Sequence, residues 1–425
     1  MLTMKRVGII HAYPSAYILD SLALLNVNVV LFGPQVSDFT HECLEDSIEC
    51  SLHDWQMLDE IIMAYHAKRS LDALLPIYEG AVEITAIMAK KIGVFGSDIH
   101  CAQASRNKFL SWQHWQDSNL STPKTLDITN THDALDRVKR ELGYPAILKL
   151  ADSMNSQGVI LVKNDDEFNS AFTQLNNLVN SPADRSYSID RNRNAYGRST
   201  IKIMAQSFCE GAEVSVDVLC NGDYQVVGLF EKAHSPGPYF AETMSIHPTS
   251  LGSKRDHELG TLAINAVKSL GFQQGIAHVE IRDSAEGPKL LEAGLRPGGA
   301  YTVMAIEHLL GINLYAMLLK IHLGIPLDTI RPSQQAALYG GIVYSRSGTL
   351  KSVHGVDVFD DMEGLLDVKI LNEIGDLVFG LPHSAQPHFC YYLLTGASRH
   401  DVMSRHEYIK KTIHLDITTL ETENG

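Results

Sequence analysis

The sequence has few cysteines, and no pattern pairs them. Its six cysteines are scattered over 425 residues, and none of them forms a Cys-x-x-Cys motif. Disulfide scaffolds and thiolate metal sites need paired or regularly spaced cysteines, so both classes are excluded and a reducing, cytoplasmic location is expected. The 19 histidines are similarly dispersed, and the His-Glu-x-x-His motif of zinc peptidases is missing.

Long apolar runs are missing too. The runs at 27–32 and 146–148 have the length of strands, far below the roughly 20 residues of a membrane-spanning helix. The first residues include the basic pair Lys5 and Arg6, but the apolar stretch that follows is short and leads straight into a turn. We therefore expect neither a signal peptide nor a membrane partner.

Positive charge is in deficit. There are 35 Lys and Arg residues against 50 Asp and Glu residues, a net charge of −15. Non-specific binding to nucleic acid or to anionic membranes relies on clustered basic residues, so neither partner is expected. With 45% apolar and 20% charged residues, a disordered chain is excluded as well. The length corresponds to about three domains.

Two common nucleotide-binding signatures do not occur. The sequence has no Gly-x-Gly-x-x-Gly turn and no Walker A motif, which argues against a nicotinamide-dependent dehydrogenase and a P-loop enzyme. What the N-terminal part does have is an alternation of strand-length apolar runs with helical patterns. The strands are expected at 7–11, 27–32 and 74–78, and the helices at 17–25 and 81–92. This alternation predicts a parallel α/β sheet covered by helices.

A hairpin near residues 275–299 yields geometry from sequence alone. If its turn centres on Glu286, antiparallel pairing places Glu280 directly opposite Glu292. The other face then carries the apolar residues Val279, Ile281, Leu291 and Ala293. Facing carboxylates repel, so a positive group is expected over them, and Mg²⁺ commonly takes one or two carboxylates together with water and phosphates. A solvated strand face with two unrelated glutamates is an equally good interpretation.

Two basic residues beside loops are further candidates for chemistry. Arg296 precedes Gly298 and Gly299, where the backbone could approach a ligand while the guanidinium holds a phosphate or an oxyanion. An ordinary Pro-Gly turn is the alternative. Lys149 lies in the strand AILKL before the polar loop 151–158. Its ammonium could point at phosphates or simply extend from a strand edge into water.

These residues succeed one another in an order that resembles the ATP-grasp superfamily, and within it the L-amino-acid ligases, or dipeptide synthetases. The resemblance covers essentially the whole chain. It is carried by RNKFL around Lys108, PAILKLADSMNSQGV around Lys149, QSFCEGAEVSVDV from Gln206, and the series Glu280, Glu292 and Arg296.

The resemblance implies an α/β ATP-grasp fold. It has an N-terminal Rossmann-like pre-ATP-grasp domain, a central lid subdomain, a C-terminal catalytic lobe and a last subdomain packed on that lobe. The implied boundaries are 1–103, 104–208, 209–330 and 331–425, with the loops 151–158 and 181–199 as candidates for a closing lid.

The resemblance also implies roles for single residues. ATP would be bound by Lys108 and Lys149 at its phosphates, Ser156 and Gly158 in the covering loop, Gln206, Ser207 and Phe208 beside adenine, and Glu213 at the ribose. Magnesium, with manganese as a substitute, would be held by Glu280 and Glu292. Arg296 would be catalytic, and the amino-acid substrates would contact Glu79, Glu242, Arg296, Gly298 and Gly299.

Two positions depart from the family pattern. Gly294 stands where the magnesium motif usually has asparagine, so water or another ligand must replace that amide oxygen. Gln206 stands at a hinge position that is commonly glutamate, and its amide oxygen can still accept a hydrogen bond from adenine.

The implied activity is ATP-dependent ligation. One amino-acid carboxylate becomes an acyl phosphate, the amine of a second amino acid attacks it, and a dipeptide or amide forms with ADP and phosphate. The closest alternative is an ATP-grasp enzyme of the carboxylase or purine-pathway type, with another acid or nucleophile. A homodimer and a role in making peptide antibiotics are further family-based expectations. Side chains near the reacting centre predict a partly apolar, aromatic lining: Tyr239, Phe240, Met244, Ala300 and Tyr301.

Overall fold

The computed structural model describes residues 4–12, 14–129, 131–180, 202–233, 240–380 and 387–419. Every structural statement below concerns these ranges. The expected lid loop at 181–199 and Tyr239 lie outside them.

The N-terminal part forms a four-stranded parallel sheet in the order β3-β2-β1-β4. Its strands are β1 (Arg6–Ile10), β2 (Asn28–Gly33), β3 (Leu44–Glu49) and β4 (Ala73–Leu75), and its helices are α1 (Ala16–Ala23), α2 (Trp55–Lys68) and α3 (Val82–Ile92). β1 and β2 are almost entirely buried, as expected of parallel strands covered on both faces. The expected strands and helices are therefore confirmed. β3 and α2 were missed, because the edge strand LEDSIE carries few apolar residues.

A second, antiparallel sheet has the order β5-β8-β6-β7. It consists of β5 (Thr125–Asp127), β6 (Ala146–Leu150), β7 (Ile160–Val162) and β8 (Ile203–Ser207), with α6 (Ala134–Glu141) and α7 (Asp165–Asn180) packed on it. The loop 151–158 joins β6 to β7, as predicted. The helices α4 (Ile99–Arg106) and α5 (Lys108–Asp117) connect this sheet to the N-terminal one.

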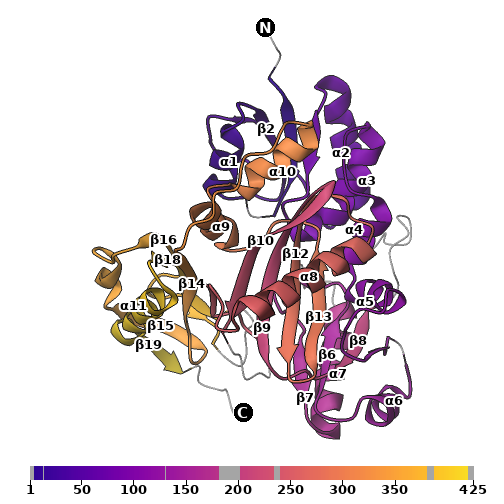
Figure 1. The fold of residues 1–425 in the computed structure, drawn as a ribbon, viewed down its shortest axis with the longest axis vertical. Helices are drawn as coiled ribbons and strands as arrows, with labels where there is room; N and C mark the ends of the chain where they lie inside the picture. The colour runs from indigo at the N-terminus through magenta and orange to yellow at the C-terminus, as the bar shows by residue number, and fades with distance from the viewer. Residues whose placement is uncertain are drawn as a thin grey trace.

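The centre of the molecule is an eight-stranded antiparallel sheet in the order β13-β12-β9-β10-β11-β14-β18-β16. Its strands are β9 (Ala212–Asn221), β10 (Asp223–Lys232), β11 (Met244–His247), β12 (Gln274–Ser284), β13 (Gly287–Gly294), β14 (Ala336–Val343), β16 (Leu365–Ile370) and β18 (His388–Gly396). The sheet continues across residue 330, so the segment expected as a last subdomain shares it with the catalytic lobe (Figure 1). The domain boundaries themselves stay a prediction.

The two faces of this sheet are covered differently. Helix α8 (Ser253–Ser269) packs on one face. On the other face, α9 (Thr302–Leu310) and α10 (Leu314–Leu323) fill the space between the N-terminal sheet and one end of β9 and β12. Figure 1 shows α10 beside the N-terminal sheet and β6 to β8 at the far end of the central strands. The uncovered end of this second face is where polar residues gather.

In the N-terminal part, the 3₁₀ turn η1 (Glu79–Ala81) leads from β4 into α3. The C-terminal part is completed by η3 (Val356–Phe359), α11 (Arg399–Thr412) and a three-stranded sheet of β15 (Gly348–His354), β17 (Leu377–Val378) and β19 (His414–Thr419). All six cysteines are free thiols. Within the described ranges no single helix is long and apolar enough to cross a membrane; only α9 and α10 taken together would be, and the chain bends by 87° between them.

The β12–β13 hairpin contains the predicted pair of facing glutamates, but its turn and its register differ from those predicted. Glu280 does lie opposite Glu292. Ser284 pairs with Gly287, however, so the turn centres between Ala285 and Glu286, and a bulge after Glu280 then shifts the register. The extra residue reverses the expected side of Leu291. Leu290 is buried in the core, whereas Leu291 lines a cavity.

The two glycines that flank β9 provide a test of the packing here. An ideal Cβ at Gly211, where φ is +139°, would lie 2.0 Å from the carbonyl oxygen of Asp283, whereas one at Gly222, where φ is +85°, meets nothing within 4 Å. Both alanine variants carry backbone strain, but only Gly211→Ala adds a clash. We expect Gly211→Ala to lower the free energy of unfolding by about 1–3 kcal/mol more than Gly222→Ala does, as measured by urea denaturation. Equal losses would contradict the β9–β12 packing described.

Candidate active site

A cavity of about 570 Å³ opens between the N-terminal part, the sheet β5-β8-β6-β7 and the central sheet. Most of the residues predicted for the site line it: Glu79, Lys108, Lys149, Ser156, Gln206, Ser207, Phe208, Glu213, Glu242, Glu280, Glu292, Arg296 and Gly299. Phe240, Ala300 and Tyr301 line it too, as expected. Met244 does not, because its side chain is buried in the core of the C-terminal part.

Two predicted glycines also lie off the cavity lining. Gly158 has a left-handed φ of +71°, and a Cβ there would contact Leu150 and Leu175 in the core beneath the sheet β5-β8-β6-β7. Gly298 is buried and donates its N–H to Asp217 at 2.9 Å. Both glycines shape their loops, and neighbouring residues of the same loops line the cavity instead.

Lys108 and Lys149 define one end of the cavity. Lys149 lies in β6, almost fully buried, and Lys108 begins α5. Burial, assisted by the neighbouring charge of Lys108, lowers the pKa of Lys149 to about 8. The adjoining loop has left-handed backbone at Asn155 and Ser156, a conformation that can turn N–H groups toward an anion. These features suit a bound phosphate chain.

The segment 206–208 forms a partly apolar wall of the cavity, beside the strand that carries Lys149. Gln206 is buried, and its side-chain nitrogen donates to Thr125 Oγ1 at 2.9 Å, which fixes the orientation of the amide. Ile147, which pairs with Gln206 across the two strands, also lines the cavity, as do Phe208 and Leu291. An apolar slot beside a fixed amide is suited to a planar heterocycle.

Glu280 and Glu292 face the cavity from neighbouring strands. The positive groups expected over them are lysines: Lys232 Nζ lies 2.6 Å from Glu280 and Lys108 Nζ lies 3.1 Å from Glu292. Burial would raise the pKa of Glu280, but Lys232 and His278 outweigh it and lower the pKa to about 2. Burial prevails at Glu292, whose pKa is raised although Lys108 opposes the shift.

The donor set at this pair fits magnesium. The described residues contain no group of three or more His, Cys, Asp or Glu side chains arranged to hold a metal. Here the chain offers two carboxylates. Mg²⁺ commonly binds one or two protein carboxylates and completes its coordination shell with water and phosphate oxygens. Gly294 adds no side-chain oxygen, and the space beside it is taken by Arg296, whose Cγ would lie 3.7 Å from a Cβ there.

Sequence analysis missed Lys232, the last residue of β10. Its ammonium contacts three carboxylates, those of Glu280 at 2.6 Å, Glu213 at 3.1 Å and Glu242 at 3.4 Å, and its side chain is only 9% exposed. Burial opposes the charge, yet these acids raise the pKa of Lys232 well above its usual value. A lysine at a strand end carries no sequence signal, because its partners come from three other segments.

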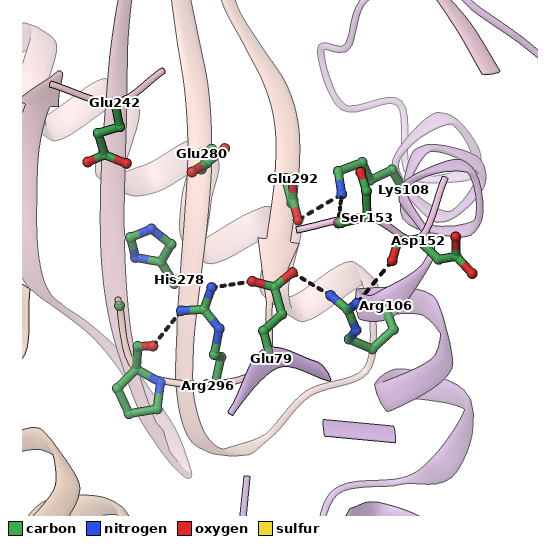
Figure 2. A network of polar contacts seen from close by, with 12 residues as sticks. Glu79, Arg106, Lys108, Asp152, Ser153, Glu242, His278, Glu280, Glu292 and Arg296 are labelled. Carbon is green, nitrogen blue, oxygen red and sulfur yellow. Dashed lines mark hydrogen bonds and ion pairs between the residues drawn. The ribbon is translucent and has the colours of Figure 1, made fainter. Parts of the chain in front are cut away.

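Arg106 is a second residue that the sequence did not point to, and it is joined to Arg296 through Glu79. The two carboxylate oxygens of Glu79 bind Arg106 and Arg296, one each (Figure 2). Arg106 also donates to the carbonyl oxygen of Asp152 at 3.1 Å. Burial would raise the pKa of Glu79, but the two arginines keep it far below its usual range. In this structure Glu79 therefore orients Arg296 and joins it to the loop 151–158.

A buried pair fixes the segment that follows Arg296. Asp217 is fully buried, lies 3.2 Å from His278 Nδ1 and accepts the N–H of Gly298. Burial lowers the pKa of His278, but Asp217 outweighs it, so the pKa is raised. A signal for Asp217 was present in the sequence, because alternation in EVSVDV places it on the same strand face as Glu213.

Comparison with known proteins agrees with this geometry. Residues 142–303 match the family model of the ATP-grasp domain. The chain contains an ATP-grasp domain. The L-amino acid ligase from Bacillus licheniformis superposes with a TM-score of 0.85 over 98% of this chain and 99% of that one, at 22% identity. The predicted ATP-grasp fold is confirmed.

Several relatives at the sequence level are named as ligases or synthases. Human carnosine synthase 1 (Homo sapiens) is 23% identical over 296 residues, 67% of this chain and 34% of that protein. Alanine–anticapsin ligase of Bacillus subtilis (strain 168) is 22% identical over 295 residues, 67% of this chain and 61% of that protein. The chain thus matches about a third of the length of the carnosine synthase and under two thirds of the length of the anticapsin ligase.

The lowered pKa of Lys149 predicts how the cavity responds to pH. The lysine is mostly charged below pH 8 and mostly neutral above it, and only the charged form attracts phosphates. The dissociation constant of ATP, with magnesium present, should therefore rise about tenfold between pH 7 and pH 9. In Lys149→Arg the guanidinium stays charged, so the rise should be much smaller, as calorimetric titration at both pH values can show. The same slope in both proteins would remove Lys149 from the phosphate site.

Proposed function

We propose that the protein is an ADP-forming, ATP-dependent carboxylate–amine ligase that joins two amino acids or closely related acids and amines. The observation that carries the proposal is the convergence in one cavity of two lysines, a pair of facing carboxylates and an arginine held by Glu79. The names of relatives such as alanine–anticapsin ligase and D-alanine–D-alanine ligase support amino-acid substrates over the carboxylase or purine-pathway alternative.

The charge and shape of the cavity support ATP binding. In the proposed complex Lys108 and Lys149 would contact the phosphates and the 206–208 wall would contact adenine, and all of these residues line the cavity. Glu213, which bonds Arg282 and Lys232, has a carboxylate suited to ribose hydroxyls. Glu280 and Glu292 would hold magnesium, which neutralises phosphate charge when bound.

The chemistry needs a carboxylate oxygen to become a leaving group. In the proposed first step the substrate carboxylate attacks the γ-phosphorus of ATP, and the bond from that phosphorus to the bridging oxygen breaks. ADP departs, and the substrate becomes an acyl phosphate. Lys108 and Lys149 hold the transferred phosphoryl group. Because Lys149 is buried, its charge acts in a medium of low dielectric, where it is felt strongly.

The second step forms the amide. The amine of the other substrate attacks the acyl carbon, Arg296 stabilises the tetrahedral oxyanion, phosphate leaves, and the amine loses a proton. Removing one such donor costs about 3 kcal/mol of transition-state stabilisation. Glu242 is the acid suited to pairing with a substrate ammonium or accepting its proton, because its side chain is 37% exposed and lines the cavity.

The direct experiment measures ADP and phosphate release with the proteinogenic amino acids, singly and in pairs. The proposal expects release only with suitable amino acids, and a dipeptide or amide in equal amount. Release that ignores amino acids but responds to bicarbonate or a nucleotide-pathway amine would favour the alternative ATP-grasp enzyme.

Glu292 provides the sharpest variant. Glu292→Gln keeps the size of the side chain but removes the charge that would hold magnesium, so ligation and ADP formation should fall by at least about 100-fold. The matched control is Glu286→Gln, the same substitution in the exposed turn of the same hairpin, which should keep full activity. Full activity in Glu292→Gln would remove the metal assignment.

A further inference from the structure

The cavity extends past Glu242 into the C-terminal part of the central sheet, where three tyrosines form a wall. Tyr301 precedes α9, Tyr339 lies in β14 and Tyr391 lies in β18, and all three line the cavity. The ring centroids of Tyr301 and Tyr339 are 6.1 Å apart, and those of Tyr339 and Tyr391 are 5.9 Å apart. These distances are within the range of direct aromatic contact, so the wall is continuous.

The polar ends of two of these tyrosines are bound by the protein itself. The Tyr301 hydroxyl donates to Asp367 at 2.8 Å, and the Tyr391 hydroxyl lies 3.0 Å from His388 Nδ1. Hydroxyls engaged in this way hold the rings in place. What the wall adds to the cavity is therefore mainly ring surface.

The rest of this end is also largely apolar. Phe240, Met304 and Leu371 line the same cavity, while the charged residues Asp367 and Lys369 lie on the solvent-exposed edge strand β16. Asp367 is already bonded to Tyr301. An apolar interior with charges at its edge is typical of a pocket that binds a hydrophobic group and leaves its rim in water.

The wall is connected to the residues of the proposed reacting centre on two sides. His388, which orients Tyr391, contacts the backbone oxygen of Glu242 through Nε2 at 2.9 Å. At the other side, Gly299 and Ala300 line the cavity and join Tyr301 to the segment that begins at Arg296. Figure 2 shows Glu242 on the far side of Glu280 from Lys108, so the contact between His388 and Glu242 lies away from the lysine end of the cavity.

We propose that this tyrosine wall is the side-chain subsite for one of the two amino acids, and that it selects a large apolar or aromatic side chain. The inference rests on the proposed ligase function and adds a substrate class to it. A small side chain would leave the ring surface uncovered. An acidic side chain would lose its hydration against that surface and lie near the charge of Glu242.

The test compares substrates and wall variants in the phosphate-release assay. With a saturating partner amino acid, wild-type kcat/KM should be at least about tenfold higher for phenylalanine, leucine or methionine than for alanine or glutamate. Tyr339→Ala should lower the ratio of phenylalanine to alanine by at least about tenfold, while Tyr339→Phe, which keeps the ring, should preserve it. The KM for ATP should stay unchanged in both.

A second wall variant keeps the test valid if Tyr339→Ala does not fold, and a variant outside the wall is the control. Tyr301→Ala alters the wall at a partly exposed position, and it should lower the same ratio even if Tyr339→Ala fails to fold. Tyr408→Ala, at an exposed tyrosine on α11, is the control and should leave the ratio unchanged. A preference for alanine or glutamate, or wall variants with the wild-type ratio, would overturn the subsite while the ligase function stands. ATP cleavage without any dependence on amino acids would overturn both.

Discussion

The organisation of the site depends on two carboxylates that the sheet forces to face each other. Glu280 and Glu292 are paired across β12 and β13, and each needs a positive charge near it to remain ionised. Lys232 supplies one from β10, and Lys108 supplies the other from α5. The pair thus explains why basic residues from separate layers converge here in a protein whose net charge is −15.

The same pairing of opposite charges links the layers to Arg296, the arginine proposed to stabilise the oxyanion. Glu79 comes from the end of the N-terminal sheet, Arg106 from α4 and Arg296 from the segment after the hairpin. Since breaking a buried charge pair leaves a charge without compensation, this chain of contacts resists displacement of any one member. Arg296 is therefore pre-oriented by the fold, and the loop at Asp152 is coupled to it through Arg106.

Local patterns in the sequence predicted much of this, and long-range contacts supplied the rest. The strand–helix alternation, the strand containing Lys149 and the facing glutamates depend on periodicity and turn geometry, which act over short separations. The bulge that turns Leu291 toward the cavity is set by packing of β12 against β9 and β13, so the sequence did not predict it. Lys232 and Arg106 were missed because the acids that define them are remote in sequence.

The central claim is that ATP activates a carboxylate as an acyl phosphate in this cavity, and trapping that intermediate tests it most directly. Hydroxylamine, supplied in place of the second amino acid together with ATP, magnesium and an acid substrate, is a nucleophile that converts an acyl phosphate into a hydroxamate. If the acyl phosphate forms, hydroxamate and ADP appear in equal amounts, and Glu292→Gln yields neither product. AMP and pyrophosphate, or ADP without hydroxamate, would contradict it.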